Sequence, residues 1–427
     1  MAYAKSKILR NILIRYKKDM KNRKVFCVFF CMQKEKEEEN FNSWDQKIRE
    51  FLKGECFMKI ICKKEDLAKA VQTVSKAVPS KSSNSILECI LVRAEDGRIT
   101  LTGNNLEFGI ETVMSGTIEK EGGIAIQAKV FGEIVRKLPN GDVVLEKGET
   151  DQATLHCKKT KYDLAVKPAT EYTDIPTVEK MNQIEISEFD LKEAIRQTIF
   201  SVADDSSNKV LTGELWEING GELKIVAVDG HRIALRKVKL KKAYEPRQAI
   251  VPGKTLMEIV KIIGGDPEKE LAVYFTDNHI QFEIDNTRAV SRLIEGNYIK
   301  VEQLLSADYG TKIKVQKKDL QECIDRAGLL LKEEGKTPII LNIEANLLYL
   351  EAKSKIGSMN ECLFVMREGE KLRIGFNPKF LLEMLRVIDD EEISMYFTTE
   401  KTPCTVRDEK DSYIYLVLPV NLSPAAA

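Results

Sequence analysis

The apolar residues of this chain follow a helical pattern that recurs three times at equal spacing. In the segment AKVFGEIVRKL, which begins at Ala128, large apolar side chains fall at i, i+3, i+4 and i+7, as in a helix that lies on a core. The segments GKTLMEIVKII, from Gly253, and PKFLLEMLRVI, from Pro378, repeat this pattern, each 125 residues after the one before. A repeat of this length predicts that whole domains are duplicated.

Charged residues keep the same register in these three segments. Each has a lysine, a glutamate four residues later and a second cation seven residues later: Lys129, Glu133 and Arg136; Lys254, Glu258 and Lys261; Lys379, Glu383 and Arg386. In a single helix this arrangement is typical of a solvated face whose pairs contribute about 0.2–0.5 kcal/mol each. Its recurrence at one spacing favours a basic face that all the repeats share.

Further elements are predicted in the same order around each of these helices. A short strand enters a first helix, and Ser187 begins one such helix with the capping pattern S-x-x-D. A strand pair follows, with Asp96-Gly97 and Gly220-Gly221 as turn dipeptides. The third copy of the repeated helix starts at Asn377-Pro378, a cap followed by proline. Alternating strands then close each repeat, which predicts an α+β fold with helices on one face of largely antiparallel sheets.

The repeat and the length of 427 residues together predict three domains. Loops such as KPATEYTDIP and LLSADYG separate them. We place the domains at residues 58–180, 181–310 and 311–427, after an atypical N-terminal extension of residues 1–57.

The extension has no counterpart in the repeats. We interpret it as a mis-assigned start, with translation beginning at Met58, because Lys53-Gly54-Glu55 can be encoded by a purine-rich ribosome-binding sequence. A signal peptide and a regulatory arm are the alternatives, although no small-residue cleavage site follows the apolar run VFCVFFCM.

Composition narrows the possible functions. No apolar run approaches the roughly 18 residues that cross a bilayer, and the nine cysteines lack CxxC spacing, so we expect a cytoplasmic protein without disulfides, metal or cofactor. The formal net charge is zero, but the extension carries 14 Lys and Arg against 8 Asp and Glu, which leaves the repeats with a charge of −6. Any contact with nucleic acid must therefore depend on local basic faces.

Catalytic motifs are absent from the sequence. The segment Asp229-Gly230-His231-Arg232 resembles a catalytic constellation, which leaves an α+β hydrolase as one alternative, but an Asp-Gly turn is the simpler interpretation. Asn105 stands opposite Asp229 in the first repeat, and no histidine follows it.

Additional cations occur on and after the first helix of each repeat, less regularly than those of the repeated helix. If these helices line one wall, their cations would meet phosphates without reading bases. They are Lys69, Lys76, Lys81, Arg196, Arg326 and Lys332.

From Met58 to Leu422 the chain resembles the bacterial sliding clamps, the beta subunits of DNA polymerase III. The resemblance depends on LTGNNLE at 101–107, AVDGHRIA at 227–234, the three repeated helices and YLVLPV at 415–420. It implies three clamp domains per chain in a head-to-tail homodimeric ring, with helices inside and sheets outside. It also implies a non-enzymatic processivity factor that slides on duplex DNA.

The family binds its partners through a cleft between the second and third domains. The implied partners are the polymerase III catalytic subunit, the clamp loader, repair polymerases and mismatch-repair proteins, each through a linear peptide with apolar anchors. Carried over to this sequence, the cleft consists of Leu211, Val228, Gly230, His231, Arg232, Ile233, Leu304, Pro403, Leu416, Val417, Leu418, Pro419 and Val420. Asp229 would form the turn, and His231 and Arg232 the polar rim.

The resemblance also implies a dimer interface and shows some departures from the family. Tyr162 and Leu164 would lie against Leu329 and Leu330 of the partner subunit. A frequent proline beside the cleft is replaced within Gly296-Asn297-Tyr298-Ile299-Lys300, Lys81 and Asn421 stand where other residues are common, and the tail SPAAA is additional. These departures bear on peptide preference and DNA contacts, and a diverged clamp paralogue with altered partners is the second alternative.

Overall fold

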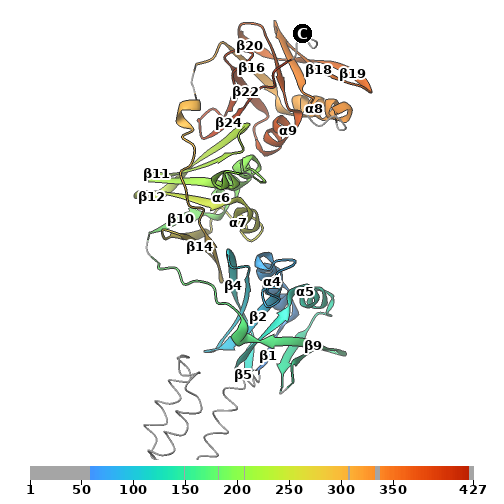
Figure 1. Cartoon of the computed structure of the whole chain (residues 1–427), viewed down its shortest axis with the longest axis vertical. Helices are drawn as coiled ribbons and strands as arrows, with labels where there is room; N and C mark the ends of the chain where they lie inside the picture. The colour runs from blue at the N-terminus through green and yellow to red at the C-terminus, as the bar shows by residue number, and fades with distance from the viewer. Residues whose placement is uncertain are drawn as a thin grey trace, which may run out of the picture. The chain divides into compact units, whose positions relative to one another are not determined.

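The computed structural model divides the chain into two compact units (Figure 1). It describes residues 58–148, 150–180, 182–205, 207–305, 308–331 and 337–422. The N-terminal extension, Lys332 and the tail from residue 423 lie outside the described residues. The first unit takes residues up to 68, 89–100 and 114–172, and the second takes 69–88, 101–113 and 173 onwards.

The first unit is an antiparallel sheet that carries the first copy of the repeated helix. Its strands follow the order β2-β6-β9-β8-β7-β1-β5. Helix α5 (Ala128–Lys137) buries Phe131 and Val135, members of the predicted apolar stripe. The remaining elements are β1 (Met58–Lys63), β2 (Cys89–Glu95), β5 (Thr117–Lys120), β6 (Gly122–Gln127), β7 (Asp142–Lys147), β8 (Gln152–Cys157), β9 (Thr160–Pro168) and η3 (Ala169–Glu171).

Three elements contain residues of both units, and the second unit begins with a five-stranded sheet. The shared elements are α4 (Lys64–Val74), β3 (Arg98–Asn104) and β4 (Phe108–Met114). The sheet has the order β10-β13-β14-β15-β4. Its strands are β10 (Gln183–Ser187), β13 (Glu270–Phe275), β14 (His279–Ile284), β15 (Thr287–Arg292) and β4 (Phe108–Met114).

The second unit has two more antiparallel sheets. The larger is β11 (Gly213–Val228), β12 (Arg232–Pro252), β24 (Tyr413–Val417), β23 (Cys404–Arg407), β22 (Glu392–Phe397), β16 (Thr311–Gln316) and β20 (Met366–Gly369). The smaller is β19 (Gly357–Phe364), β18 (Leu347–Ser354), β17 (Ile339–Glu344) and β21 (Leu372–Phe376). The helices are η2 (Ser75–Ala77), α6 (Glu188–Thr198), η4 (Ile199–Ser201), η5 (Lys209–Thr212), α7 (Gly253–Ile259), η6 (Glu302–Leu304), α8 (Lys317–Leu331) and α9 (Pro378–Val387).

The three repeated helices form where the sequence predicts them. Helices α5, α7 and α9 begin at the three equivalent positions, although α7 has only seven residues. The Asn377 side chain accepts a hydrogen bond of 3.0 Å from the amide of Lys379, and Ser187 caps α6 through the amide of Asp190 at 3.3 Å. Both predicted caps are confirmed. Helices α8 and α9 lie side by side in the third repeat (Figure 1).

The two glycine turns have different outcomes. Asp96 and Gly97 both adopt positive φ, 51° and 72°, between β2 and β3, so the predicted hairpin turn is confirmed. Gly220 also has positive φ, 57°, but it lies within β11, whose pairing with β12 shifts register on both sides of it. The second dipeptide thus lies at an irregularity within a long strand.

Strand β24 is buried on both faces. Its odd-numbered residues, Tyr413, Tyr415 and Val417, belong to the core of the third repeat, around α8 and α9. Ile414 and Leu416 belong to a second apolar cluster with residues of β11 and β12. Because β12 pairs with β24, one sheet continues from the second repeat into the third.

Glu214 is an acidic side chain fully buried in the second repeat. Burial raises its pKa to about 8, although hydrogen bonds with Thr198 and Trp216 oppose the shift. The Oγ1 of Thr198 lies 2.8 Å from both Ala194 O and Glu214 Oε1, and it has only one proton to donate. A protonated Glu214 can donate to Thr198 Oγ1 while Trp216 Nε1 donates to its other oxygen at 3.2 Å. The geometry therefore fits a neutral carboxyl group.

We expect Glu214→Gln to remove a pH dependence of stability, because the glutamine amide can reproduce these hydrogen bonds without titrating. The folded-state pKa of about 8 lies above the reference value of 4.5, so the folded state binds the extra proton between these values. The free energy of unfolding of the unmodified protein should fall as pH rises through this window, by up to about 1.4 kcal/mol per pH unit. Urea denaturation from pH 5 to 9 measures the difference, and parallel curves for both proteins would contradict a protonated Glu214.

Candidate functional site

Apolar side chains from the second repeat, the third repeat and the segment between them form one cluster. Four residues of the predicted cleft meet in it: Val228, Ile233 and Leu416 are buried, and Leu211 packs against them half-buried. The other members are Val210, Leu215, Val226, Leu235, Ile250, Val301 and Ile414, with Ile294, Tyr298 and Leu305 at the margin. No sequence pattern predicts Val301 and Ile294 as members, because they lie in irregular segments.

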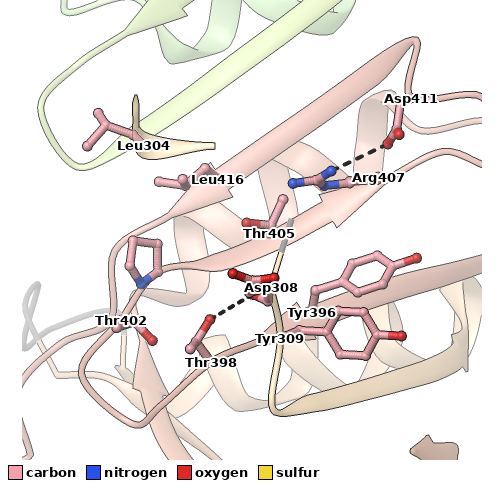
Figure 2. Close-up of a pocket in the computed structure, with 11 residues that line it drawn as sticks. Leu304, Asp308, Tyr309, Tyr396, Thr398, Thr402, Thr405, Arg407, Asp411 and Leu416 are labelled. Carbon is pink, nitrogen blue, oxygen red and sulfur yellow. Dashed lines mark hydrogen bonds and ion pairs between the residues drawn. The ribbon is translucent and has the colours of Figure 1, made fainter. Parts of the chain in front are cut away.

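A pocket of about 410 Å³ adjoins this cluster (Figure 2). Three residues of the predicted cleft line it: Leu304, Pro403 and Leu416. Leu304 is 51% exposed and Leu416 only 3%, so one apolar side chain is accessible and the other belongs to the floor. The remaining lining residues were not predicted: Asp308, Tyr309, Tyr396, Thr398, Thr402, Thr405, Arg407 and Asp411.

The unpredicted residues supply the aromatic and polar parts of the pocket. Tyr309 and Tyr396 pack edge to face with ring centroids 5.2 Å apart. At another side Arg407 lies 3.7 Å from Asp411 (Figure 2). Sequence periodicity could not predict this pair, since Tyr309 lies in a loop and Tyr396 is one position in an alternating strand.

The segment after β24 continues the predicted cleft beyond the pocket. Val417 is fully buried in the core of the third repeat, whereas Leu418 is 41% exposed. The amide of Leu418 donates to His231 O at 2.9 Å, and that of Val420 donates to Gly375 O at 2.8 Å. These bonds fix the backbone on either side of Pro419, so Leu418 presents an apolar side chain at a defined place.

The segment 229–232 forms a tight turn. One carboxylate oxygen of Asp229 accepts from the amides of His231 at 2.9 Å and Arg232 at 3.1 Å. The other accepts from Arg232 Nε at 2.8 Å, and Gly230 adopts a φ of 92°. Both oxygens of Asp229 thus hold the turn and its arginine, as expected of a turn former. Among the described residues, no group of three or more His, Cys, Asp or Glu could hold a metal ion.

Arg232 does not lie at the polar rim where the sequence analysis placed it. Its side chain is only 5% exposed and is bound by Asp229, by Glu383 of α9 and by the carbonyl oxygen of Phe200. Its guanidinium carbon lies 4.6 Å from the ring centre of Phe380 and 5.2 Å from that of Phe200. Burial lowers the pKa of Arg232, but the hydrogen bond to Glu383 and the nearby charges outweigh this effect, so the group stays charged. Exposed His231 is the rim residue of the pair.

The predicted DNA-facing cations are mostly accessible. Of those that the structure describes, all are exposed except Lys76 and Arg196, which are half-buried. Burial lowers the pKa of Lys76; nearby Glu258 opposes this shift and Lys261 adds to it, so Lys76 lies close to α7. Several cations have carboxylate neighbours: Arg196 with Glu193 and Asp389, Lys261 with Glu258, Arg326 with Glu322 and Glu361, Lys379 with Glu383, and Arg386 with Asp325. Lys69, Lys81, Lys129, Arg136 and Lys254 have no ion pair among the described residues.

The residues predicted to join two subunits lie at accessible edges. Tyr162 is exposed and Leu164 half-buried on β9, which pairs with β6 only from Val166 onwards. Leu329 is exposed and Leu330 half-buried on α8. Helix α8 packs against β19, the edge strand of its sheet. Exposed Ile356 and Phe364 flank this edge and were not predicted.

Three family models match consecutive parts of the chain. They describe the N-terminal, central and C-terminal domains of the DNA polymerase III beta subunit and match residues 58–176, 185–300 and 302–421. The chain belongs to this family. The sliding-clamp resemblance and the α+β fold of three clamp domains are thereby confirmed, and with them the function of a polymerase processivity factor.

Individual sliding clamps agree with the family models. The chain is 34% identical to the beta sliding clamp of Bacillus subtilis over 380 residues and 30% identical to that of Staphylococcus aureus over 374 residues, with 85% of this chain and 99% of each relative covered. A putative DNA polymerase III beta subunit from Eubacterium rectale matches in structure with a TM-score of 0.83 and 49% identity, covering 86% of this chain and 99% of that one. The Bacillus subtilis clamp structure matches with a TM-score of 0.83, 33% identity and coverage of 86% and 100%.

We expect adjacent residues of the cleft segment to respond differently to truncation. Val417→Ala removes buried methyl groups from a packed core and should lower the free energy of unfolding by about 1–3 kcal/mol. Leu418→Ala removes an accessible side chain and should change it by less than about 1 kcal/mol. Chemical denaturation of both variants checks the contrast, which equal losses would contradict.

Proposed function

We propose that this sliding clamp forms a homodimeric ring around duplex DNA and tethers DNA polymerase through the cleft between its second and third repeats. The observation that carries the proposal is the accessible pocket beside the buried cluster, with Leu304 exposed in its lining and Leu418 exposed two residues after Leu416, which also lines it. Exposed apolar side chains that gather beside a pocket mark interaction sites, and an apolar floor with a polar end suits a short peptide.

The chemistry of the cleft indicates the kind of partner. Leu304 and Leu418 can bury aliphatic or aromatic anchors of a linear peptide, while His231 and the polar pocket side orient its backbone. We assign to this cleft the polymerase III catalytic subunit, the clamp loader, repair polymerases and mismatch-repair proteins. They would compete for one site per subunit. The protein itself would bind and position, without catalysing a reaction.

The exposed cations of the repeated helices support a sequence-independent contact with DNA. Lys129, Arg136 and Lys254 are exposed and have no ion pair among the described residues, so phosphates can approach them without breaking one. The repeats outside the extension carry a charge of −6, so bulk attraction to DNA is not available. A closed ring resolves this difficulty, because topological linkage holds the clamp while weak contacts let it slide.

The open edges support association of two chains. The part of β9 around Tyr162 and Leu164 has a single strand neighbour among the described residues, β8. Strand β19 likewise pairs only with β18 in the described part of the chain. Unpaired strand edges that carry apolar side chains are templates for pairing with another chain. Both edges would be covered in a head-to-tail dimer, with Leu329 and Leu330 beside them.

We expect the double variant Leu304→Ala and Leu418→Ala to lose at least tenfold in stimulation of DNA polymerase III on primed circular DNA, because two accessible anchors of the cleft are removed. Leu106→Ala is the matched control, since Leu106 is 53% exposed, close to the 51% of Leu304, and does not line the pocket. Sedimentation should show a dimer at micromolar concentration for all three proteins. If the double variant is dimeric and still stimulates DNA polymerase III, the assignment of this cleft as the partner site is wrong.

A further inference from the structure

The three equivalent glutamates of the repeated helices have different surroundings. Glu133 on α5 is exposed and has no ion pair among the described residues. Glu258 on α7 pairs with Lys261, two residues after the end of that helix, at 2.7 Å. Glu383 on α9 binds a buried residue of the preceding repeat, Arg232, while its other oxygen lies 3.8 Å from Lys379. Among the described residues, Glu383 is thus the only one of the three glutamates that forms an ion pair with a residue of another repeat.

The contact with Arg232 is much the stronger of the two that Glu383 makes. Lys379 is 65% exposed, and pairs between solvated charges contribute little. Arg232 is buried and lies against the rings of Phe200 and Phe380, and its remaining donors go to Asp229 and to the Phe200 carbonyl oxygen. A buried guanidinium needs such partners, because an unpaired charge there is costly. Glu383 and Phe380 thus fix the place of Arg232 against α9.

The position of Arg232 in turn determines the position of the cleft residues on either side of it. His231 stacks on Phe380, with ring centres 5.9 Å apart and planes 23° from parallel. The carbonyl oxygen of His231 accepts the amide of Leu418 at 2.9 Å, and Ile233 lies in the buried floor. One arginine side chain thereby anchors both the rim and the floor of the cleft to α9.

We propose that Glu383 is a positioning residue for the partner-peptide cleft, acting through Arg232 to hold the 229–233 turn, and with it His231 and Leu418, in the geometry that receives a peptide. This inference rests on the proposed function of the cleft. Glu383 does not line the pocket, so its effect on binding would be indirect. Through Glu383, the third copy of the repeated helix would position the cleft, a role that the first two copies do not have.

The experiment compares Glu383→Gln and Glu383→Ala with Glu258→Ala and Glu133→Ala in the full-length protein. The probe is a fluorescein-labelled peptide from the clamp-binding segment of the polymerase III catalytic subunit, and anisotropy gives its Kd at 20 °C. Glu383→Ala should raise Kd at least fivefold. Glu383→Gln keeps an oxygen that can accept from Arg232 and should raise Kd less, whereas both control variants should stay within twofold of the unmodified protein.

The outcomes separate positioning from stability alone and from failure of the proposed function. A graded loss, alanine larger than glutamine, with unchanged dimer sedimentation supports the inference. A lower Tm with Kd within twofold for both Glu383 variants overturns it, because Glu383 would then only stabilise the fold. If Glu383→Ala does not fold, Glu383→Gln alone tests the inference. A rise in its Kd of more than twofold supports positioning, and a smaller change overturns it. If the unmodified protein does not bind the peptide, the cleft assignment itself is wrong and the inference falls with it.

Discussion

The burial of β24 on both faces is the constraint on which the second unit depends. Tyr413, Tyr415 and Val417 complete the core of the third repeat, while Ile414 and Leu416 complete the cluster shared with the second. A strand with two buried faces cannot shift by one residue without exchanging every side chain between two cores. The C-terminal end of β24 therefore holds Leu418 at a fixed position. The cleft is in this sense a consequence of how two repeats share one strand.

The buried charge of Arg232 adds a second constraint at the same junction. Asp229 uses both carboxylate oxygens for the turn and for this arginine, which leaves neither free for the hydrolytic role that the segment 229–232 suggested. Glu383 completes the pairing from α9. The segment 229–232, which resembles an active site in sequence, therefore links the second and third repeats through the ion pairs of Arg232.

Much of the fold could be predicted because the sequence repeats itself. Three apolar stripes in one register located α5, α7 and α9, and short-range capping rules located the ends at Ser187 and Asn377. Such features depend on neighbours in the sequence. The register shift at Gly220 was not predicted, because it depends on how β12 pairs with both sides of it.

The candidate site was predicted less completely, for the same reason. Residues carried over from the family, such as Val228, Ile233 and Leu416, do meet in one cluster. The inward turn of Arg232 depends on Phe200 and Phe380, which are distant from it in sequence and gave no pattern. The pairing of Tyr309 with Tyr396 also joins a loop to a distant strand. Hydrophobic periodicity in the sequence predicts which face of a helix or strand is buried, but it does not predict which residues that face contacts.

Encirclement of DNA by the ring is tested by comparing how long the protein is retained on DNA with and without free ends. The protein would be loaded by clamp loader and ATP onto a nicked circular plasmid, separated by gel filtration, and then treated with a restriction enzyme that cuts once. A clamp closed around DNA should elute with the circle at moderate salt and be released within minutes of cutting. Equal retention on circular and linear DNA would contradict encirclement, because binding would then depend on direct contacts with the DNA and not on a closed ring.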